Sequence, residues 1–168
     1  MYEHSAGIPL IVWWPRRWGG EQRRRGACSL VDLVQTITEL AGAEAPEDWD
    51  GDSMLPWLDG TDRSWKDLAL SEYYGHNIAS GFTMLRQGKY KYVYHARFDE
   101  EHGPEQELYD LEVDPEEFCN LANEPAYTNV TASMHERLVR ELGEDPDDIE
   151  QRCRDDYSRG YSRNPEEH

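Results

Sequence analysis

One run of residues constrains the fold of this chain most strongly: Lys89-Tyr90-Lys91-Tyr92-Val93-Tyr94. Its period of two is typical of a β-strand, and it places the three tyrosines on one face and Lys89, Lys91 and Val93 on the other. Gln87-Gly88 can form a tight turn, so residues 82–86 and 89–94 are predicted to pair as a hairpin. We expect the tyrosines to pack on the sheet rather than to offer a platform for a ligand.

Four further segments carry strand or helix patterns. Residues 68–73 and 107–110 are predicted strands, which would extend the hairpin into an antiparallel sheet. A helix is predicted for residues 29–41, because its apolar residues recur at helical spacing and Ser29 can cap its first turn. A second helix is predicted for residues 125–142, and we expect it to cover one face of the sheet.

The two ends of the chain differ from this pattern. Residues 8–14 are apolar on both faces and are predicted to form a strand buried in a larger sheet. A buried strand needs neighbours on both sides, so its position near residue 1 predicts that a preceding part of the sheet is missing from this sequence. Residues 144–168 are acidic and poor in large apolar residues, and we expect them to be disordered.

The composition excludes several classes of partner. The 168 residues carry a formal net charge of −18, which disfavours nucleic acids and anionic membranes as partners. No signal peptide is visible, nor an apolar run of about 20 residues, so a cytoplasmic location is expected. The basic residues are three lysines and fourteen arginines, and this acidic, lysine-poor surface is compatible both with a halophilic source and with an ordinary acidic protein.

No complete catalytic or metal site emerges from the residues alone. The three cysteines form no Cys-x-x-Cys pair, and the six histidines show no ligand spacing. His95 and His102 flank the acidic residues 99–101, where a solvated loop is favoured over a metal site. Glu3-His4-Ser5 has the residue types of a triad, but adjacent residues rarely face one another usefully. His76 follows a predicted strand, where loops often bind ligands, although an ordinary polar loop is the favoured alternative.

A set of short motifs resembles the C-terminal part of a sulfatase of the alkaline phosphatase superfamily, of the arylsulfatase and choline-sulfatase kind. Each motif alone is weak, whereas their order and spacing make the resemblance fairly specific over residues 1–142. The motifs occupy residues 1–12, which include Tyr2-Glu3-His4-Ser5, and residues 29–42, 49–56, 71–73, 86–92, 107–117 and 120–122.

The resemblance implies a hydrolase that cleaves sulfate esters. Members of this family use a formylglycine, made from the cysteine of a Cys-x-Pro-x-Arg motif, and bind a divalent cation, usually calcium. No cysteine here lies in such a motif, and the resemblance implies that the cation ligands belong to the family's N-terminal domain. We therefore expect neither a catalytic residue nor a metal ligand in this chain, and no activity of the chain alone. His76, Glu3 and His4 are the residues expected to contact a sulfate-ester substrate if an N-terminal half supplies the rest of the site.

These expectations together define an α+β fold class. Residues 1–63 are interpreted as the incomplete end of an α/β sulfatase domain, to which they contribute a strand and a helix. Residues 64–143 are predicted to form a small antiparallel sheet with a closing helix, and residues 144–168 a disordered acidic tail. Two alternatives for the function remain open: a non-catalytic binding or accessory module, and a phosphate or phosphonate ester hydrolase of the same superfamily.

Overall fold

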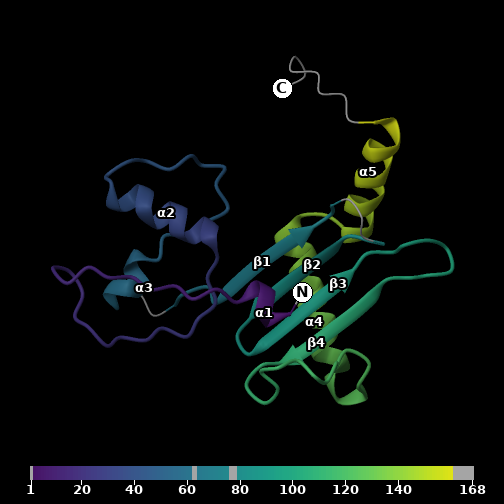
Figure 1. Cartoon of the computed structure of the whole chain (residues 1–168), viewed down its shortest axis with the longest axis horizontal. Coiled ribbons are helices and arrows are strands. Elements are labelled where there is room, and N and C mark those ends of the chain that lie inside the picture. Colours follow the sequence, from purple (N-terminus) through teal and green to yellow (C-terminus); the bar gives the residue numbers. More distant parts are fainter. Residues whose placement is uncertain (1, 62–63, 76–78, 161–168) are drawn as a thin grey trace. The chain divides into compact units, whose positions relative to one another are not determined.

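Two compact units make up the chain, whose computed structural model describes residues 2–61, 64–75 and 79–160 (Figure 1). The first unit comprises residues 1–69 and 86–90, and the second comprises residues 70–85 and 91–168. Each helix within the described ranges is too short or too polar to cross a membrane. The elements are, in chain order, α1 (Glu3–Ala6), α2 (Leu30–Leu40), α3 (Leu55–Asp59), β1 (Leu68–Tyr73), β2 (Phe82–Gln87), β3 (Tyr90–His95), β4 (Glu105–Asp110), the 3-10 helix η1 (Pro125–Tyr127), α4 (Thr128–Leu142) and α5 (Pro146–Arg159).

The four described strands form one antiparallel sheet in the order β1-β2-β3-β4, so each strand pairs with its neighbour in sequence. The predicted hairpin is confirmed as β2 and β3, and the α+β fold class is confirmed with it. Gly88 makes the turn between these strands possible, because its φ of 55° lies in the left-handed region that disfavours residues with a Cβ atom.

The core of the second unit lies between the sheet and α4 (Figure 1). Tyr92 and Tyr94 of β3 reach this helix, since Tyr92 Oη lies 3.0 Å from His135 Nδ1 and the ring centroids of Tyr94 and His135 lie 5.0 Å apart. The tyrosines therefore pack in the core, as predicted. Met134 and Leu138 are buried on the α4 side of this core. The strands add the fully buried residues Leu85 and Leu108, whereas Val93, also fully buried, lies on the face of β3 opposite Tyr92 and Tyr94.

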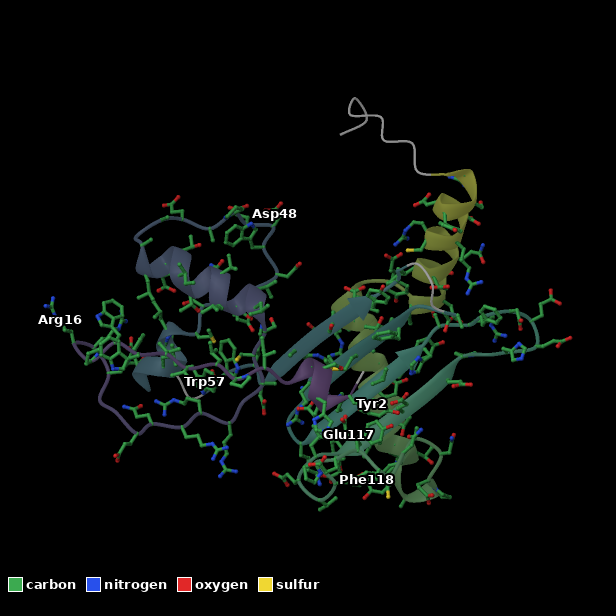
Figure 2. The ribbon with its side chains drawn as sticks, viewed as in Figure 1. Tyr2, Arg16, Asp48, Trp57, Glu117 and Phe118 are labelled. Carbon is green, nitrogen blue, oxygen red and sulfur yellow. The ribbon has the colours of Figure 1, made fainter. Side chains whose placement is uncertain are left out.

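A buried ion pair joins β3 to the loop after β4. Lys91 Nζ lies 2.6 Å from Glu117 Oε1, and the two side chains are 0% and 2% exposed. Glu117 has a φ of 59°, and the next residue of the loop, Phe118, is 84% exposed. Figure 2 labels both side chains in this loop. The pair holds the loop against the sheet, because the two buried charges compensate each other across β3 and this loop.

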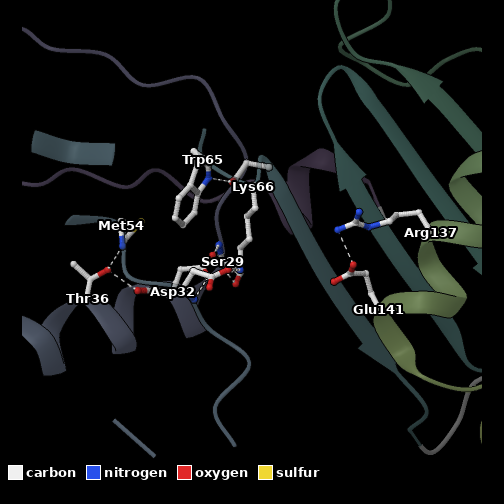
Figure 3. Close-up of polar contacts among 10 residues, drawn as sticks. Ser29, Asp32, Thr36, Met54, Trp65, Lys66, Arg137 and Glu141 are labelled. Carbon is white, nitrogen blue, oxygen red and sulfur yellow. Dashed lines mark hydrogen bonds and ion pairs between the residues drawn. The ribbon is translucent and has the colours of Figure 1, made fainter. Parts of the chain in front are cut away.

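The start of α2, in the first unit, is fixed by its own side chains (Figure 3). Asp32 forms a capping box with Ser29, whose backbone N–H donates to Asp32 Oδ2 at 2.8 Å. Thr36 Oγ1 donates to the Asp32 carbonyl oxygen at 2.6 Å and accepts from the Met54 backbone N–H at 2.8 Å. These bonds tie the helix to the loop before α3, and they confirm both the predicted helix and its Ser29 cap.

The apolar face of α2 is exposed. The buried residues of this helix are Asp32 and Thr36, whereas Leu30, Val34 and Ile37 are 61%, 47% and 56% exposed. An apolar stripe at helical spacing normally faces a core. The first unit therefore presents an apolar surface that its own described residues do not cover.

Residues 8–14 do not form the predicted buried strand. They have no regular secondary structure, and Ile11 and Trp13 are 87% and 83% exposed. A strand is stable only when its backbone groups pair with a neighbouring strand, and the strands of the described sheet pair with one another instead. The apolar side chains of this segment consequently add to the exposed surface of the first unit.

The predicted disorder of residues 144–168 is wrong for residues 146–159, which form α5. Asp145 caps this helix by accepting a hydrogen bond from the Asp147 backbone N–H at 2.9 Å, and Pro146 occupies its first turn. Ile149 is buried, and the Arg152 guanidinium donates two hydrogen bonds of 2.7 Å to Glu144. These local signals favour a helix although the segment is poor in apolar residues. The remainder of the predicted tail, residues 161–168, lies outside the described residues.

Candidate functional site

Two of the three predicted substrate contacts, Glu3 and His4, lie among the described residues. Glu3 and His4 lie on α1, a single turn in the first unit, where Glu3 is half-buried and His4 is exposed. His76 belongs to the segment between β1 and β2 and lies outside the described residues. The predicted role of these three residues in binding a substrate therefore stays a prediction.

A hollow of about 450 Å³ lies in the second unit, where β2 begins, β3 ends and β4 begins. One side of it includes Ala79 and Ser80, which follow the His76 segment directly. Its lining combines apolar rings with hydrogen-bonding groups, as sites for small polar ligands commonly do. The residues that define this character are Ser80, Phe82, His95, Phe98, His102 and Glu105.

His95 is oriented within this hollow by two linked hydrogen bonds. Its Nε2 lies 2.8 Å from Glu107 Oε1, and Tyr109 Oη donates to Glu107 Oε2 at 2.9 Å. The bond with His95 lowers the pKa of Glu107; burial opposes this shift, and the Tyr109 bond adds to it. The carboxylate thus stays ionised near neutral pH and holds the imidazole, whose ring centroid lies 5.8 Å from that of Phe82.

His102 lies in the loop between β3 and β4. Asp99 Oδ1 accepts from the backbone N–H groups of Glu101 and His102 at 2.9 and 2.6 Å, and it lies 2.8 Å from His102 Nδ1. The backbone bond from His102 is the main cause that lowers the pKa of Asp99. Residues 97–103 are all exposed, which confirms the solvated loop predicted there.

The two histidines of the hollow thus have separate carboxylate partners, Glu107 for His95 and Asp99 for His102. Across residues 2–61, 64–75 and 79–160, no group of three or more His, Cys, Asp or Glu side chains could hold a metal ion. The hollow therefore combines aromatic ring faces with two imidazoles, in each of which one nitrogen bonds a carboxylate and the other nitrogen of the neutral ring can accept a hydrogen bond.

A second polar cluster lies at the start of α2 in the first unit (Figure 3). Lys66 Nζ lies 2.7 Å from Asp32 Oδ1 and 2.9 Å from Asp52 Oδ2, and the Asp52 backbone N–H donates to Asp32 Oδ1 at 2.9 Å. Burial acts to lower the pKa of Lys66, but the hydrogen bonds to both carboxylates outweigh it, and the net pKa is raised. Because its charge is matched by two carboxylates, Lys66 holds loops together and is poorly suited to bind an anion.

Two of the thiols lack the surroundings of an activated nucleophile. Burial raises the pKa of Cys28 and that of Cys153, so both thiols stay protonated at neutral pH. No cysteine is among the described residues that line the hollow, and none of the three lies in a Cys-x-Pro-x-Arg motif. The described lining of the hollow therefore offers no thiol that could attack a ligand.

Glu107 and Tyr109 are site residues that the sequence analysis missed. Their spacing in the sequence could have indicated that the two side chains meet, because residues two apart on a strand point to the same face. Tyr109 donates a hydrogen bond to the Glu107 carboxylate across that spacing. Their link to His95 has no such signal. It depends on the register of β3 against β4, which are separated by a loop of nine residues, 96–104.

Comparisons with known proteins give this arrangement a context. The model of the family described as N-sulphoglucosamine sulphohydrolase, C-terminal, matches residues 1–144. The choline-sulfatase of Rhizobium meliloti (strain 1021) is 36% identical over 127 residues, which cover 74% of this chain and 23% of that protein. The chain spans about a quarter of the length of the curated relatives it matches.

Two solved structures resemble the chain in fold. A 2-O GAG sulfatase has a TM-score of 0.52 and 32% sequence identity, and the match covers 77% of this chain and 26% of that one. The phosphonate monoester hydrolase of Agrobacterium radiobacter has a TM-score of 0.55 and 26% identity, with 67% and 24% covered.

Proposed function

We propose that this chain, which belongs to the N-sulphoglucosamine sulphohydrolase C-terminal family, forms the substrate-facing C-terminal part of a sulfatase. Membership of the family supports a role in the hydrolysis of sulfate esters, as does the similarity to a choline-sulfatase. Within such an enzyme the chain would bind and orient the substrate, and residues outside this sequence would perform the chemical step.

The division of labour follows from what sulfate-ester cleavage requires. The reaction needs a nucleophile that attacks sulfur and positive charge that stabilises the sulfonyl oxygens. Lys66 and Lys91 are both paired with carboxylates, and the sequence has no Cys-x-Pro-x-Arg motif. We therefore assign the nucleophile to residues outside this chain. Calcium, when bound there, would supply the positive charge, since no metal-binding group occurs among the described residues.

The observation that carries the proposal is the exposed apolar face of α2. Leu30, Val34 and Ile37 lie on one stripe of that helix, and each is roughly half exposed or more. Residues 8–14 add further exposed apolar side chains to the first unit. A domain that functions alone normally buries such a stripe, so we assign this surface to contact with the remainder of the enzyme.

The hollow of the second unit is assigned to the substrate. With one nitrogen of His95 and of His102 donating to a carboxylate, the other nitrogen of each neutral ring can accept a hydrogen bond from a substrate hydroxyl, and Phe82 offers a flat apolar face to a ring. A sulfated saccharide fits this lining, in keeping with the similarity to a 2-O GAG sulfatase. His76, Glu3 and His4 stay the predicted further contacts.

A paired activity assay tests the proposal. Sulfate release from 4-nitrocatechol sulfate is measured, with calcium present, for this chain and for the chain extended by whatever the coding sequence upstream of Met1 encodes. We expect turnover by the extended protein only, and a Cys-x-Pro-x-Arg motif within the extension. Calcium-dependent turnover by the chain alone would overturn the assignment of the nucleophile.

Phosphonate ester cleavage is a second candidate, because the similarity to the phosphonate monoester hydrolase is about as strong in fold as that to the sulfatase. The sulfatase and phosphonate hydrolase candidates are distinguished by measuring kcat/KM of the extended protein for an aryl sulfate and for an aryl phosphonate monoester. A higher kcat/KM for the phosphonate would favour this candidate. A non-catalytic accessory module predicts a different result, a cooperatively folded monomer whose upstream sequence is unrelated to sulfatases.

A further inference from the structure

Helix α5 lies beyond the part of the chain that the family model matches. That match ends at residue 144, and α5 runs from Pro146 to Arg159. The helix belongs to the second unit, the unit that contains the hollow. Its buried residues are Pro146, Ile149 and Glu150, so a charged side chain takes up part of the small buried face of this helix.

Glu150 joins α5 to the wall of the hollow. Its Oε2 accepts a hydrogen bond of 2.8 Å from the Gly81 backbone N–H, and its Oε1 accepts one of 2.6 Å from Arg154 Nε. Arg154 Nη2 donates in turn to the Ala79 carbonyl oxygen at 2.7 Å. Glu150 and Arg154, one helical turn apart, therefore bond the Gly81 N–H and the Ala79 C=O. These two backbone groups lie on either side of Ser80, which lines the hollow.

The segment after β3, whose Ala96 and Phe98 also line the hollow, contacts the same helix. Asp147 Oδ1 accepts from the Arg97 backbone N–H at 2.8 Å and from Tyr94 Oη at 3.2 Å. The Arg154 guanidinium carbon lies 5.2 Å from the ring centre of Phe98, within the range of a cation–π contact. Both the segment before β2 and the segment after β3 are thus fixed by side chains of α5.

The packing at Gly81 shows how closely the helix fits this segment. Gly81 is buried, and a Cβ atom there would lie 2.6 Å from Glu150 Oε2 and closer still to the ring of Tyr74. A buried backbone N–H needs an acceptor, and a buried carboxylate needs charged or hydrogen-bonded partners. Glu150 meets both needs at once, since its two oxygens bond the Gly81 N–H and the Arg154 guanidinium.

We propose that α5 is a positioning element of the ligand hollow, and that Glu150, with Arg154, is the residue that fixes the backbone of residues 79–81. This proposal rests on the proposed function, because it takes the hollow to be the substrate site. A helix added only for stability would need to bury apolar side chains alone. Helix α5 buries Pro146 and Ile149, and in addition its polar side chains bond the backbone of the segments that line the hollow.

Amide hydrogen exchange of the ¹⁵N-labelled chain tests the positioning directly. Glu150→Ala is expected to lower the protection of the Gly81 amide by about tenfold or more, since the amide loses its acceptor. Glu150→Gln, which keeps an oxygen that can accept, is expected to restore part of that protection. Gln151→Ala changes an exposed side chain of the same helix and serves as the control. Equal protection in Glu150→Ala and wild type would overturn the proposal.

Titration with 4-nitrocatechol sulfate, followed through the amide shifts of Phe82 and His95, adds the functional readout. Glu150→Ala and Arg154→Ala are expected to weaken binding by about fivefold to tenfold, while Gln151→Ala leaves the affinity unchanged. Affinity unchanged in Glu150→Ala despite lost protection of Gly81 would also refute a positioning role. If wild type shows no shift at the hollow, the assignment of the hollow to the substrate fails, and the exchange data still decide whether Glu150 fixes the backbone.

Discussion

Glu107 links two side chains of the hollow, and its contribution should depend on pH. The substitution Glu107→Gln is expected to lower the free energy of unfolding by about 1–2 kcal/mol at pH 7, since hydrogen bonds with His95 and Tyr109 lose the carboxylate charge. The side chain of Glu107 is 19% exposed, so solvent screens these bonds only in part. Urea denaturation of both proteins measures the difference.

The pH dependence of that difference follows from the lowered pKa of Glu107 in the folded chain. As the pH falls, the unfolded chain, with a Glu pKa of about 4.3, takes up its proton first. The stabilisation is therefore complete above that unfolded pKa and is lost as the pH falls through the folded pKa. Glu105→Gln, at an exposed position of the same strand, is the control. A difference that stays constant from about pH 7 to about pH 3 would contradict the argument.

Lys91 and Glu117 form the most deeply buried ion pair among the described residues, with side chains 0% and 2% exposed. Lys91→Met is expected to destabilise the chain by about 3–5 kcal/mol, because buried Glu117 loses the ammonium group that lies 2.6 Å from its carboxylate. The double substitution Lys91→Met with Glu117→Leu should recover most of that loss, since neither charge of the buried pair remains. A double-mutant cycle from denaturant unfolding checks both results. Losses that simply add would show that the two residues do not act as a pair.

At the scale of elements, α2 depends on Asp32 more than on any apolar residue it contains. Its carboxylate is 0% exposed, accepts from the Ser29 and Asp52 backbone N–H groups, and pairs with Lys66. Asp32→Ala is expected to cost about 2–3 kcal/mol, because two backbone donors lose their acceptor. Thermal unfolding compares it with Glu39→Ala, an exposed position on the same helix. Similar losses in both variants would argue against the capping role.

The elements that could be predicted from the sequence are those with local signals. Alternation and Gly88 define the β2–β3 hairpin, Ser29 defines the start of α2, and helical spacing followed by Gly143 defines α4. Each signal lies within a few residues of the structure that it specifies. The sequence Asp145-Pro146 is also a local signal for the start of a helix, α5. The prediction of disorder relied instead on the acidic composition of the segment.

The elements that could not be predicted depend on distant partners. Residues 8–14 read as a buried strand because burial is inferred from apolar content, yet they remain exposed without a strand to pair with. The link between His95 and Glu107 requires the register of two strands across a long loop, and the bond between Glu150 and Gly81 joins residues 69 positions apart. A single sequence contains no local pattern for contacts of this kind.

At the scale of the whole molecule, charge dominates the solution behaviour. The 35 acidic residues exceed the 17 basic ones, so the folded chain repels itself at low ionic strength. The midpoint of thermal unfolding is expected to rise as KCl is increased from about 0.1 M to about 1 M, where the screening length falls to about 3 Å. Replacing the exposed Glu100 and Glu101 by glutamine should reduce this dependence, whereas an unchanged dependence would assign the effect of salt to something other than self-repulsion.

The apolar surface of the first unit has the opposite tendency, toward association. Val34 and Ile37 are 47% and 56% exposed, so the isolated chain is expected to self-associate as its concentration rises, despite its charge. Val34→Glu with Ile37→Glu should weaken that association by about tenfold or more without lowering helix content, and Glu39→Gln is the control. Sedimentation velocity and circular dichroism measure both properties.

The same pair of substitutions separates the two explanations of this surface. In the extended enzyme it should destabilise the fold by about 2 kcal/mol or more, because charges placed against a covering layer lose their hydration. In a free-standing accessory module the exposed charges would be harmless, and stability would not change. A stable extended enzyme carrying both glutamates would therefore mean that α2 faces solvent in the complete protein, and the assignment of its apolar face to the remainder of a sulfatase would have to be abandoned.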